Sequence, residues 1–505
     1  MKFWLLILIV FQTTLATAQN PVIAESLAIP ILKGTMYNPV LKLIIPVSGG
    51  QTVHLGLIKG QLTSELVNQI DNLDVFLTEA EPFNTKLKVS SFKPVSADFT
   101  IPMDIKLGPG QHFIWLSPQL KTSAPVGESL KVSLTALEKD GKVIKILTKG
   151  QLEHLTGSVV KKAGEDQVHT YRIPGLVTTG KGILLAVYDI RYLTSRDLPG
   201  HIDVGLSRST DGGNTWEPMR TIMDMGPPHE NNGIGDPAIL YDPATNTVWV
   251  AALWSKGNRS IAGSLPGLSP DTTGQFVLVK STDDGLTWSA PYSITTQVKN
   301  PAWHLFFNGP GRGIVMHDGT LVFAAQYWDE HKMPHSTIIY SRDHGRSWQG
   351  KIHGPKANTT ESQVIETTPG RLMLNMRDNR GGYRSVACTD DLGGQWVEHS
   401  SSYQALKDPV CMGSLFKSRV RINQQWSELV FFSNPHTSSG RYNMTIQASE
   451  DLGETWLPSP FLLDERMTYG YSCLTGIGDA HLGILYEGQG DLYFVKIPIT
   501  TLLAK

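Results

Sequence analysis

Apolar and polar residues alternate along three stretches of the first third of the chain: HFIWLSPQL (112–120), LKVSLTAL (130–137) and KVIKILTKG (142–150). A period of two is typical of strands with one buried face, and KDGK (139–142) predicts a tight hairpin turn between the last two stretches. We therefore predict an antiparallel β-sandwich accessory domain over residues 19–152. QLTSELVNQI (61–70) is expected to form a short helix within it.

From about residue 155 onward, strand-like apolar runs such as QFVLVKS each end in a similar eight-residue turn. The copies are STDGGNTW (209–216), STDDGLTW (281–288), SRDHGRSW (341–348), TDDLGGQW (389–396) and SEDLGETW (449–456). Their aspartates stand 72, 60, 48 and 60 residues apart. Such periods, with one four-stranded unit per repeat, predict an all-β chain whose larger part is a propeller. We expect six blades over residues 153–505, one of them without a recognisable copy of the turn.

The residue types of the turn explain why it recurs. An aspartate side chain accepts hydrogen bonds from nearby backbone N–H groups, and glycine permits a positive φ where the chain reverses. The terminal tryptophan is large enough to fill the space between neighbouring sheets. Nothing in the unit pairs a nucleophile with a base, so we interpret each copy as structural. A calcium loop is the alternative, but one or two carboxylates per copy are too few for it.

Charge and cysteine content exclude several function classes. The chain has 505 residues, with 44 Lys and Arg against 46 Asp and Glu, so no global field favours nucleic acid or an anionic membrane. No metal-binding motif appears, and we expect neither metal nor cofactor. The cysteines at 388, 411 and 473 are too few for a disulfide framework. We expect buried free thiols, and a Cys411–Cys473 pair is left open.

The N-terminus has the pattern of a targeting segment. Lys2 precedes the apolar run FWLLILIVF (3–11), and Ala16 and Ala18 form a small-residue cleavage signal. The run is too short to span a bilayer comfortably. We predict a signal peptide over residues 1–18, a periplasmic or secreted product, and no transmembrane segment after its removal. An uncleaved anchor is the alternative.

The recurring turn resembles the Asp-box motif, S-x-D-x-G-x-T-W, and TYRIPGL (170–176) resembles the Arg-Ile-Pro motif that opens the catalytic domain of sialidases. From about residue 155 to its end, the chain resembles bacterial exo-α-sialidases (neuraminidases) of glycoside hydrolase family 33. The resemblance implies hydrolysis of terminal α-ketosidically linked sialic acids from glycoproteins, gangliosides and oligosaccharides. It also likens residues 19–152 to a carbohydrate-binding domain. Phe113 and Trp115 could stack there on sugar, but we expect them in the core.

Sialic acid carries a carboxylate at its anomeric carbon, and guanidinium groups hold such an anion well because they stay charged and offer paired donors. The resemblance implies three such arginines from distant strands. Arg172 in YRIP, Arg377 in LMLNMRD and Arg441 in SSGRYNMTI match them. The third is the least determined, since Arg419 and Arg421 lie nearby in sequence.

The leaving group needs a proton. Asp197, on a loop after the run that contains VYDIRY, matches the general acid of the family, and Arg191 matches a further substrate-contacting arginine. Asp189 and Asp203 are rivals for the acid. Asp203 is expected to be a local hydrogen-bond acceptor, because it begins the strand-like run that leads into the first Asp-box.

The nucleophile has to attack beside the carboxylate of the substrate. A neutral phenol avoids like-charge repulsion there, and sialidases are the tyrosine exception among glycosidases. TYGYSCLTGIGDAHLGILYEG (468–488) offers three phenols, of which Tyr471 matches the family position; Tyr469 is its main competitor, and Tyr486 is expected to pack. Glu361, 16 residues before Arg377, is the expected base, whereas Glu366 should face elsewhere.

Asp236 in GIGDPAIL resembles the aspartate of the family pocket that contacts the N-acyl or glycerol side of the sugar, and Arg312 in FNGPGRGI is placed near the pocket rim. The same residues would serve a trans-sialidase or an intramolecular trans-sialidase. A non-catalytic glycan-binding propeller is the other alternative, and it predicts an incomplete set.

Overall fold

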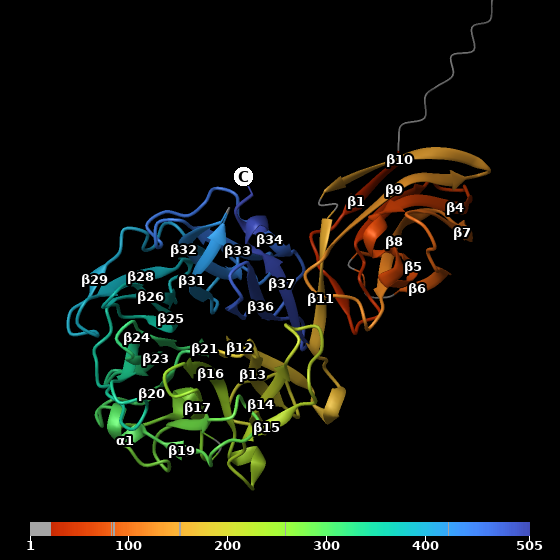
Figure 1. The fold of residues 1–505 in the computed structure, drawn as a ribbon. Helices are drawn as coiled ribbons and strands as arrows, with labels where there is room; N and C mark the ends of the chain where they lie inside the picture. Colours follow the sequence, from red (N-terminus) through yellow and green to blue (C-terminus); the bar gives the residue numbers. More distant parts are fainter. Residues whose placement is uncertain are drawn as a thin grey trace, which may run out of the picture.

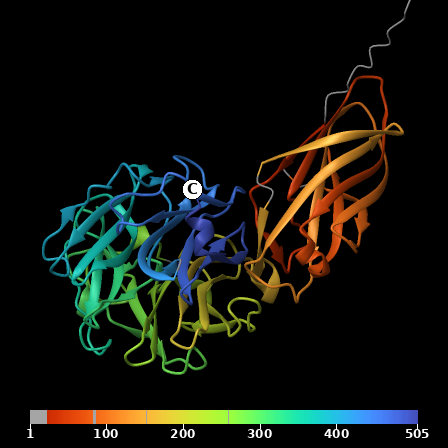
Figure 2. The same cartoon turned by 45° about the horizontal axis from the view of Figure 1, so that its top comes forward.

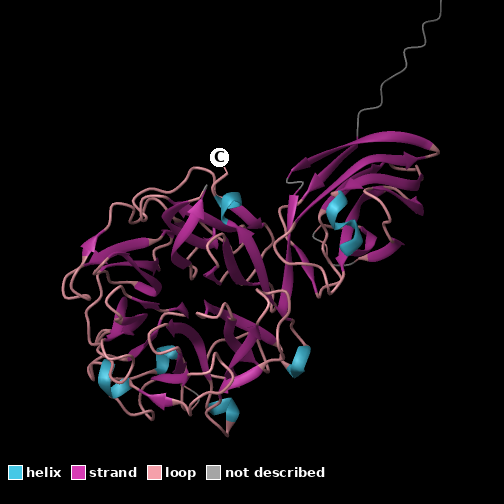
Figure 3. Ribbon diagram, in the orientation of Figure 1, coloured by secondary structure: helices cyan, strands magenta, loops and turns pink. Residues whose placement is uncertain are grey.

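The computed structural model describes residues 22–504 except 82, 84–85, 151–152, 258 and 423, so the predicted signal peptide at 1–18 lies outside the described residues. Two strand-rich bodies lie side by side (Figures 1 and 3). The helices among the described residues are short: η1 (Ser64–Gln69), η2 (Glu165–Gln167), η3 (His229–Asn231), η4 (Ile261–Gly263), α1 (Thr295–Val298) and α2 (Ile499–Leu502). None of the helices described is long and apolar enough to cross a bilayer.

The N-terminal body is a sandwich of antiparallel-rich layers (Figure 2). One layer contains β1 (Val22–Ser26), β3 (Leu41–Val47), β5 (Ile70–Thr78), β6 (Leu87–Phe92) and β8 (Gly110–Leu120). The other contains β4 (Val53–Leu62), β7 (Asp98–Leu107), β9 (Ser129–Lys139) and β10 (Lys142–Gly150). The predicted KDGK turn is confirmed: it joins β9 to β10 with Asp140 and Gly141 at φ values of 50° and 73°. The expected helix is the 3-10 segment η1, which begins only after β4 has ended.

The alternating pattern of the N-terminal body fills the space between its layers. Strand β7 alternates exposed and buried residues along its whole length, as expected for a strand with one face in the core. Phe113 and Trp115 are 5% and 3% exposed, and the Nε1 of Trp115 donates to the Oγ1 of Thr78 at 2.9 Å. Both aromatic residues are therefore buried, but in a small cluster with Phe76 on the opposite face of β8 from Ile114 and Leu116, which belong to the core between the layers.

The C-terminal body is a β-propeller (Figures 1 and 2). Within the described residues, five blades are sheets of their own. The first blade contains β12 (Thr170–Thr178), β13 (Leu184–Arg191), β14 (Ile202–Ser209) and β15 (Arg220–Met223), and the second contains β16 (Ile234–Asp242), β17 (Thr247–Trp254), β18 (Gln275–Ser281), β19 (Tyr292–Ser293) and the added strand β21 (Gly311–Arg312). The third contains β20 (Leu305–Asn308), β22 (Ile314–Val315), β23 (Leu321–Trp328) and β24 (Pro334–Ser341). The fourth contains β25 (Thr359–Thr368), β26 (Arg371–Asp378), β28 (Ser385–Thr389) and β29 (Val397–Glu398), and the fifth contains β31 (Ser414–Ile422), β32 (Gln425–Pro435), β33 (Met444–Ser449) and β34 (Phe461–Asp464). A small ribbon pairs β27 (Gly382–Tyr383) with β30 (Lys407–Asp408).

The predicted number of six separate blades is corrected to five. The remaining propeller strands are β35 (Ser472–Ile477), β36 (His481–Glu487) and β37 (Leu492–Pro498). Among the described residues they do not form a sheet of their own, because β37 pairs with β11 (Glu153–Lys161), which also pairs with β9 and with β2 (Ile31–Lys33). This run of strands continues into the N-terminal body as one 14-stranded sheet, so the two bodies share backbone hydrogen bonds.

The five Asp-box turns, all within the described residues, are built as predicted. In the first, Oδ1 of Asp211 accepts the backbone N–H of Thr215 at 2.9 Å, and Oδ2 accepts its hydroxyl at 2.6 Å. The hydroxyl of Ser209 donates to the same aspartate and accepts the N–H of Gly213. In the same way, the backbone N–H of the residue four positions later donates to Asp283, Asp343, Asp391 and Asp451. Each carboxylate is thus used within its own turn.

Candidate active site

The first strands of successive blades contact one another, and their leading ends gather the predicted site residues. β12 contacts both β16 and β35, and β31 contacts both β25 and β35. Arg172 stands near the start of β12, Glu361 near the start of β25, and Tyr471 just before β35. Residues separated by up to about 300 positions in sequence therefore meet at one end of the propeller.

Tyr471, Glu361 and Arg377 form one hydrogen-bonded cluster. The Tyr471 hydroxyl donates to the Glu361 carboxylate, with Oη lying 2.5 Å from Oε1 and 2.7 Å from Oε2. Nη1 of Arg377 donates to Oε2 of Glu361 and, at 3.0 Å, to Oη of Tyr471. Nε of Arg377 is buried and has no hydrogen-bond partner among the described residues. The predicted pairing of Tyr471 with Glu361 is thus present in the geometry, and one donor of Arg377 stays available.

The environment of Tyr471 keeps its phenol protonated in the free protein. The residue is 6% exposed. Burial and then the charge of Glu361 raise the pKa of Tyr471 well above its ordinary value, while Arg377 acts in the opposite direction. A neutral phenol can donate its proton to the carboxylate beside it. The arrangement can therefore transfer that proton to Glu361 when negative charge on the oxygen becomes stabilised.

Arg172 is held by a carboxylate that sequence reasoning missed. Glu487, the last residue of β36, is fully buried, and its Oε1 accepts Nε of Arg172 at 3.0 Å and the N–H of Ile173 at 2.9 Å. Its Oε2 accepts the N–H of Tyr471 at 2.8 Å. Ile173 has a φ of 57°, which is strained for a β-branched residue. One glutamate thus fixes both Arg172 and Tyr471; its only sequence signal was its place at the end of an apolar strand.

Arg441 completes the cationic group around the phenol. Its Nη1 donates to the backbone O of Tyr469 at 2.9 Å and its Nη2 to the O of Val410 at 3.3 Å, while its guanidinium lies 5.6 Å from the ring centre of Tyr471. Arg172 lies 5.2 Å from the same ring and 4.8 Å from that of Tyr469. Arg172, Arg377 and Arg441 therefore surround Tyr471.

Asp197 lies on the loop between β13 and β14, and its carboxylate faces Arg191 and Arg172. Its Oδ1 is 2.8 Å from Nη1 of Arg191 and 3.5 Å from Nη1 of Arg172, although its side chain is 64% exposed. Burial acts to raise the pKa of Asp197, but Arg191 and Arg172 outweigh burial and lower it. Arg191 itself is 1% exposed and donates from Nε and Nη2 to Asp189. Arg191 therefore connects a buried carboxylate to an exposed one.

Asp236 joins the same group at the start of β16. Its backbone N–H donates to Oδ1 of Asp189 at 2.8 Å, and its φ is 58°. Burial and then the charges of Asp189 and Asp197 raise the pKa of Asp236 well above its ordinary value. Its carboxyl has no hydrogen-bond partner among the described residues. Its carboxyl therefore holds a proton more strongly than an ordinary aspartate does.

The rival residues have other partners. The hydroxyl of Tyr486 donates to Oδ2 of Asp464 at 3.0 Å inside the core, as expected for a packing residue. Asp189 is used by Arg191 and is 1% exposed. Both oxygens of Glu366 accept backbone N–H groups, from His317 and Gly370. Arg419 stacks on Trp426, and Nη1 of Arg312 donates to the backbone O of Leu474, so neither is bonded to the cluster around Tyr471.

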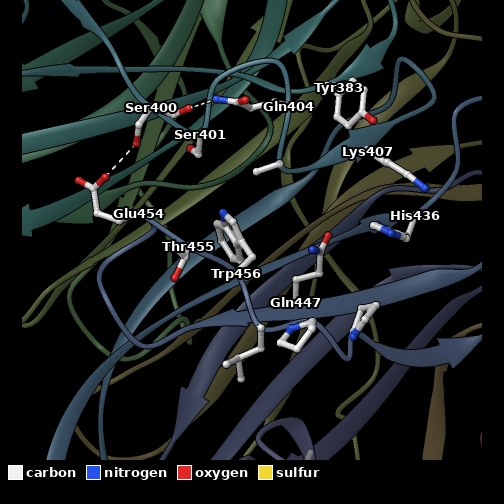
Figure 4. A pocket seen from close by; sticks show the side chains of 14 residues that line it. Tyr383, Ser400, Ser401, Gln404, Lys407, His436, Gln447, Glu454, Thr455 and Trp456 are labelled. Carbon is white, nitrogen blue, oxygen red and sulfur yellow. Dashed lines mark hydrogen bonds between the residues drawn. The ribbon is translucent and has the colours of Figure 1, made fainter.

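One surface groove lies apart from this cluster. It has a volume of about 550 Å³ and lies between the blades that begin with β25 and β31. Figure 4 shows Tyr383, Lys407, His436, Gln447 and Trp456 around it. It contains none of the arginines described above, so its size does not make it the active site. Among the described residues, no group of three or more His, Cys, Asp or Glu could hold a metal ion. All three cysteines are buried and free, which confirms the expected free thiols.

Comparison with known proteins agrees with this geometry. The family described as BNR repeat-like domain matches residues 184–484, and the N-terminal domain of BNR-repeat neuraminidase matches residues 19–143. A sialidase of Bacteroides fragilis is 50% identical over 397 residues, which cover 76% of this chain and 73% of that protein. The chain belongs to the sialidase family.

Solved sialidase structures extend the agreement to the whole fold. Hadza microbial sialidase Hz136 has a TM-score of 0.89 and 38% identity, covering 95% of this chain and 99% of that one. Trypanosoma rangeli sialidase, solved with 2,3-difluorosialic acid as a covalent intermediate, has a TM-score of 0.57 and 22% identity over 68% of this chain and 57% of that one, which shows a shared fold. This sialidase is a glycoside hydrolase.

Proposed function

We propose that this sialidase is a retaining exo-α-sialidase that acts through a sialyl intermediate on Tyr471. The observation that carries the proposal is the contact of the Tyr471 hydroxyl with Glu361 at 2.5 and 2.7 Å, beside Nη1 of Arg377 at 3.0 Å. A nucleophile within hydrogen-bond reach of a base, with a third group orienting the base, is the arrangement that activates a weak nucleophile.

The substrate carboxylate binds to Arg172, Arg377 and Arg441 in this proposal. Among the described residues, the buried Nε of Arg377 lacks a partner, and Arg441 is bonded only to backbone carbonyl oxygens. Guanidinium groups form strong charge-assisted hydrogen bonds to carboxylates. The bound anion is thereby placed against the face of Tyr471, and the anomeric carbon next to it comes within reach of the phenol oxygen. Asp236 contacts another part of the sugar.

The first displacement breaks the glycosidic bond. Tyr471 Oη attacks the anomeric carbon as its proton passes to Glu361, and Asp197 gives a proton to the departing oxygen. The carboxylate of the substrate neutralises part of the positive charge of Arg172, 3.5 Å from Asp197, and so favours the protonated acid. In the second displacement, Asp197 takes a proton from water, the water attacks the anomeric carbon, and Tyr471 recovers its proton from Glu361. Two displacements give net retention.

Trapping with a 2,3-difluorinated sialic acid tests the proposal. We expect a single sialyl adduct on the peptide that contains Tyr471, located by mass spectrometry, and no adduct in Tyr471→Phe. A label on Tyr469 would contradict the assignment. Proton NMR of the first product formed from an α2-3-linked sialoside should show the α-anomer. Formation of the β-anomer would contradict retention, and an anhydro or transferred product would favour the intramolecular or transferase alternatives.

The proposal includes the biological setting. The substrates are terminal α-linked sialic acids of glycoproteins, gangliosides and oligosaccharides, and the enzyme acts in the periplasm or outside the cell after removal of residues 1–18. The pattern of Lys2, the apolar run and Ala16-Thr17-Ala18 supports export. The mature protein is then expected to begin at Gln19, which N-terminal sequencing of the exported enzyme would check.

A further inference from the structure

A second cavity lies further along the propeller from the arginine cluster. It has a volume of about 250 Å³, and its charged lining consists of Arg312, Lys417, Arg419 and Glu366. Nη1 of Arg312 donates to the backbone O of Leu474 at 3.1 Å. Leu474 follows Tyr471 by three residues, which corresponds to about 10 Å along a strand. The cavity is named the basic cavity here, and it is separate from the active site.

Arg312 has no carboxylate partner among the residues that the structure describes. Its guanidinium donates to two backbone oxygens, of Leu474 and, at 3.4 Å, of Gly313, and lies 4.6 Å from the ring centre of Phe416. Burial lowers the pKa of Arg312, which agrees with an uncompensated cation. A guanidinium withdrawn from water is costly unless an anion compensates its charge. Glu366 does not, because its oxygens accept the N–H groups of His317 and Gly370.

Other buried arginines of the propeller differ in this respect. Arg172 pairs with Glu487 at 3.0 Å, and Arg191 pairs with Asp189 at 2.8 Å. The arginine that does resemble Arg312 is Arg441, which also donates to backbone oxygens and faces an aromatic ring without a carboxylate partner among the described residues. Arg441 is the residue for which an anionic ligand is already proposed on independent grounds. The same bonding pattern at Arg312 marks a second place prepared for an anion.

Two further cations border the cavity from β31. Lys417 and Arg419 are two positions apart on this strand, so their side chains leave the same face. Nζ of Lys417 donates to the O of Thr367 at 2.7 Å and lies 3.2 Å from Glu428, which offsets part of its charge. Arg419 stacks on Trp426 at 4.7 Å and has no carboxylate within 4.0 Å among the described residues. Among the described residues, three cations and one carboxylate, Glu366, line the cavity, so its net charge is positive.

We propose that the basic cavity binds a small oxyanion, of the class of phosphate, sulfate or a simple carboxylate, with Arg312 as the principal ligand-binding residue. The bound anion would connect β21 with β31 and, through the bond of Arg312 to Leu474, with β35. Its role is to stabilise the end of the propeller remote from Tyr471. The site does not take part in the reaction on sialic acid, so it can be tested independently of the proposed mechanism.

Thermal unfolding of the full chain in inorganic phosphate tests the site. At constant ionic strength, phosphate at about ten times its dissociation constant should raise the Tm of the wild type by about 2 °C relative to chloride. Arg312→Gln should lose this rise while keeping kcat/KM for a sialoside within about twofold of wild type. Arg441→Gln is the matched control, because it should keep the rise and lose activity.

Three outcomes would overturn the proposal: no phosphate-specific rise in the wild type, an unchanged rise in Arg312→Gln, or loss of the rise in Arg441→Gln alone. If Arg312→Gln does not fold, the variant with both Lys417→Gln and Arg419→Gln takes its place and should weaken phosphate binding at least about fivefold. Crystals of the wild type soaked in selenate provide an independent readout. An anomalous peak within hydrogen-bond distance of Arg312 supports the site, and its absence at a selenate concentration that saturates the Tm rise counts against it.

Discussion

Nη1 of Arg172 lies 3.5 Å from Oδ1 of Asp197, so one arginine contacts both the proposed acid and the proposed binding place of the substrate carboxylate. The acid is not isolated from substrate binding. Removing a cation near a carboxyl raises the pKa of that carboxyl, and a carboxylate arriving at Arg172 has an effect of the same sign. Asp197 should therefore hold its proton more strongly in the complex than in the free enzyme.

Arg191→Gln tests this coupling, because it removes the cation that lies 2.8 Å from Asp197. The pKa of Asp197 should rise, so the alkaline limb of the kcat profile should move to higher pH by about one unit. The measurement is kcat between pH 4 and 9 with a sialyl-lactose substrate, whose leaving group needs the proton. Arg191→Lys keeps the charge and should shift the limb less. Arg220→Gln, at an exposed ion pair, should not shift it, and equal profiles for all three variants would refute the coupling.

Glu487→Gln should destabilise the protein and weaken substrate binding. Two carboxylate oxygens of Glu487 receive three donors, from Arg172, Ile173 and Tyr471, whereas glutamine offers one acceptor oxygen and an amide that itself donates. The variant leaves a buried arginine without its counter-charge, for which we expect a loss of about 3–5 kcal/mol in the free energy of unfolding. Urea unfolding followed by tryptophan fluorescence measures it.

A structural role alone would change stability without changing substrate affinity. Because Glu487 holds Arg172 in place, KM should also rise in the Glu487→Gln enzyme that remains folded. Glu454→Gln is the control: this side chain is 60% exposed and bonds His399 and Ser400 on the surface, so it should cost less than about 1 kcal/mol. Equal losses in the free energy of unfolding for Glu487→Gln and Glu454→Gln would contradict the buried role of Glu487.

The sequence predicted the residues that occur in recognisable patterns. The Asp-box turns are local, so their hydrogen bonds follow from residues within eight positions. Tyr471, Glu361 and Arg377 were placed through family motifs. Glu487 could not be predicted in the same way, because a glutamate after an apolar strand is normally exposed and only the fold shows it buried beneath Arg172. The position of β11 was also hidden, since a strand that precedes the propeller in sequence pairs with the strand that ends it.

The Asp-box turns should affect stability and leave catalysis unchanged. Oδ1 of Asp451 accepts the N–H of Thr455 at 2.8 Å and Oδ2 accepts its hydroxyl at 2.6 Å, and both bonds are lost in Asp451→Ala. We expect a loss of about 2 kcal/mol in the free energy of unfolding. The turn is separated from Arg441 by the whole of β33, about 16 Å, so kcat/KM per folded molecule should stay at the wild-type value. Asp451→Asn keeps Oδ1 and should lose less, and a large loss of kcat/KM in either variant would contradict a purely structural role.

Asp203 should make stability depend on pH near the loop that carries Asp197. Burial and then the charge of Asp224 raise the pKa of Asp203 to about 7. Its Oδ2 is 4.0 Å from Nε2 of His201, whose ring stacks on Tyr192 at 4.0 Å, and the N–H of Tyr192 donates to the O of His201. Tyr192 and His201 thus hold together the two ends of the loop that carries Asp197. A negative charge on Asp203 is therefore buried next to the contact between Tyr192 and His201.

The sign of the effect follows from the two pKa values of Asp203. An unfolded aspartate titrates near pH 3.9, so between about pH 4 and 7 the folded state holds a proton that the unfolded state has lost, and stability falls as the pH rises. Asp203→Asn removes this dependence and should be more stable than the wild type by about 3 kcal/mol at pH 8, relative to their difference at pH 4.5. Urea unfolding at both values measures the change. Asp390→Asn, on an exposed turn, is the control, and its stability relative to the wild type should not change between the two pH values. If the stability of Asp203→Asn relative to the wild type is also the same at both pH values, Asp203 is ionised throughout, and the prediction is wrong.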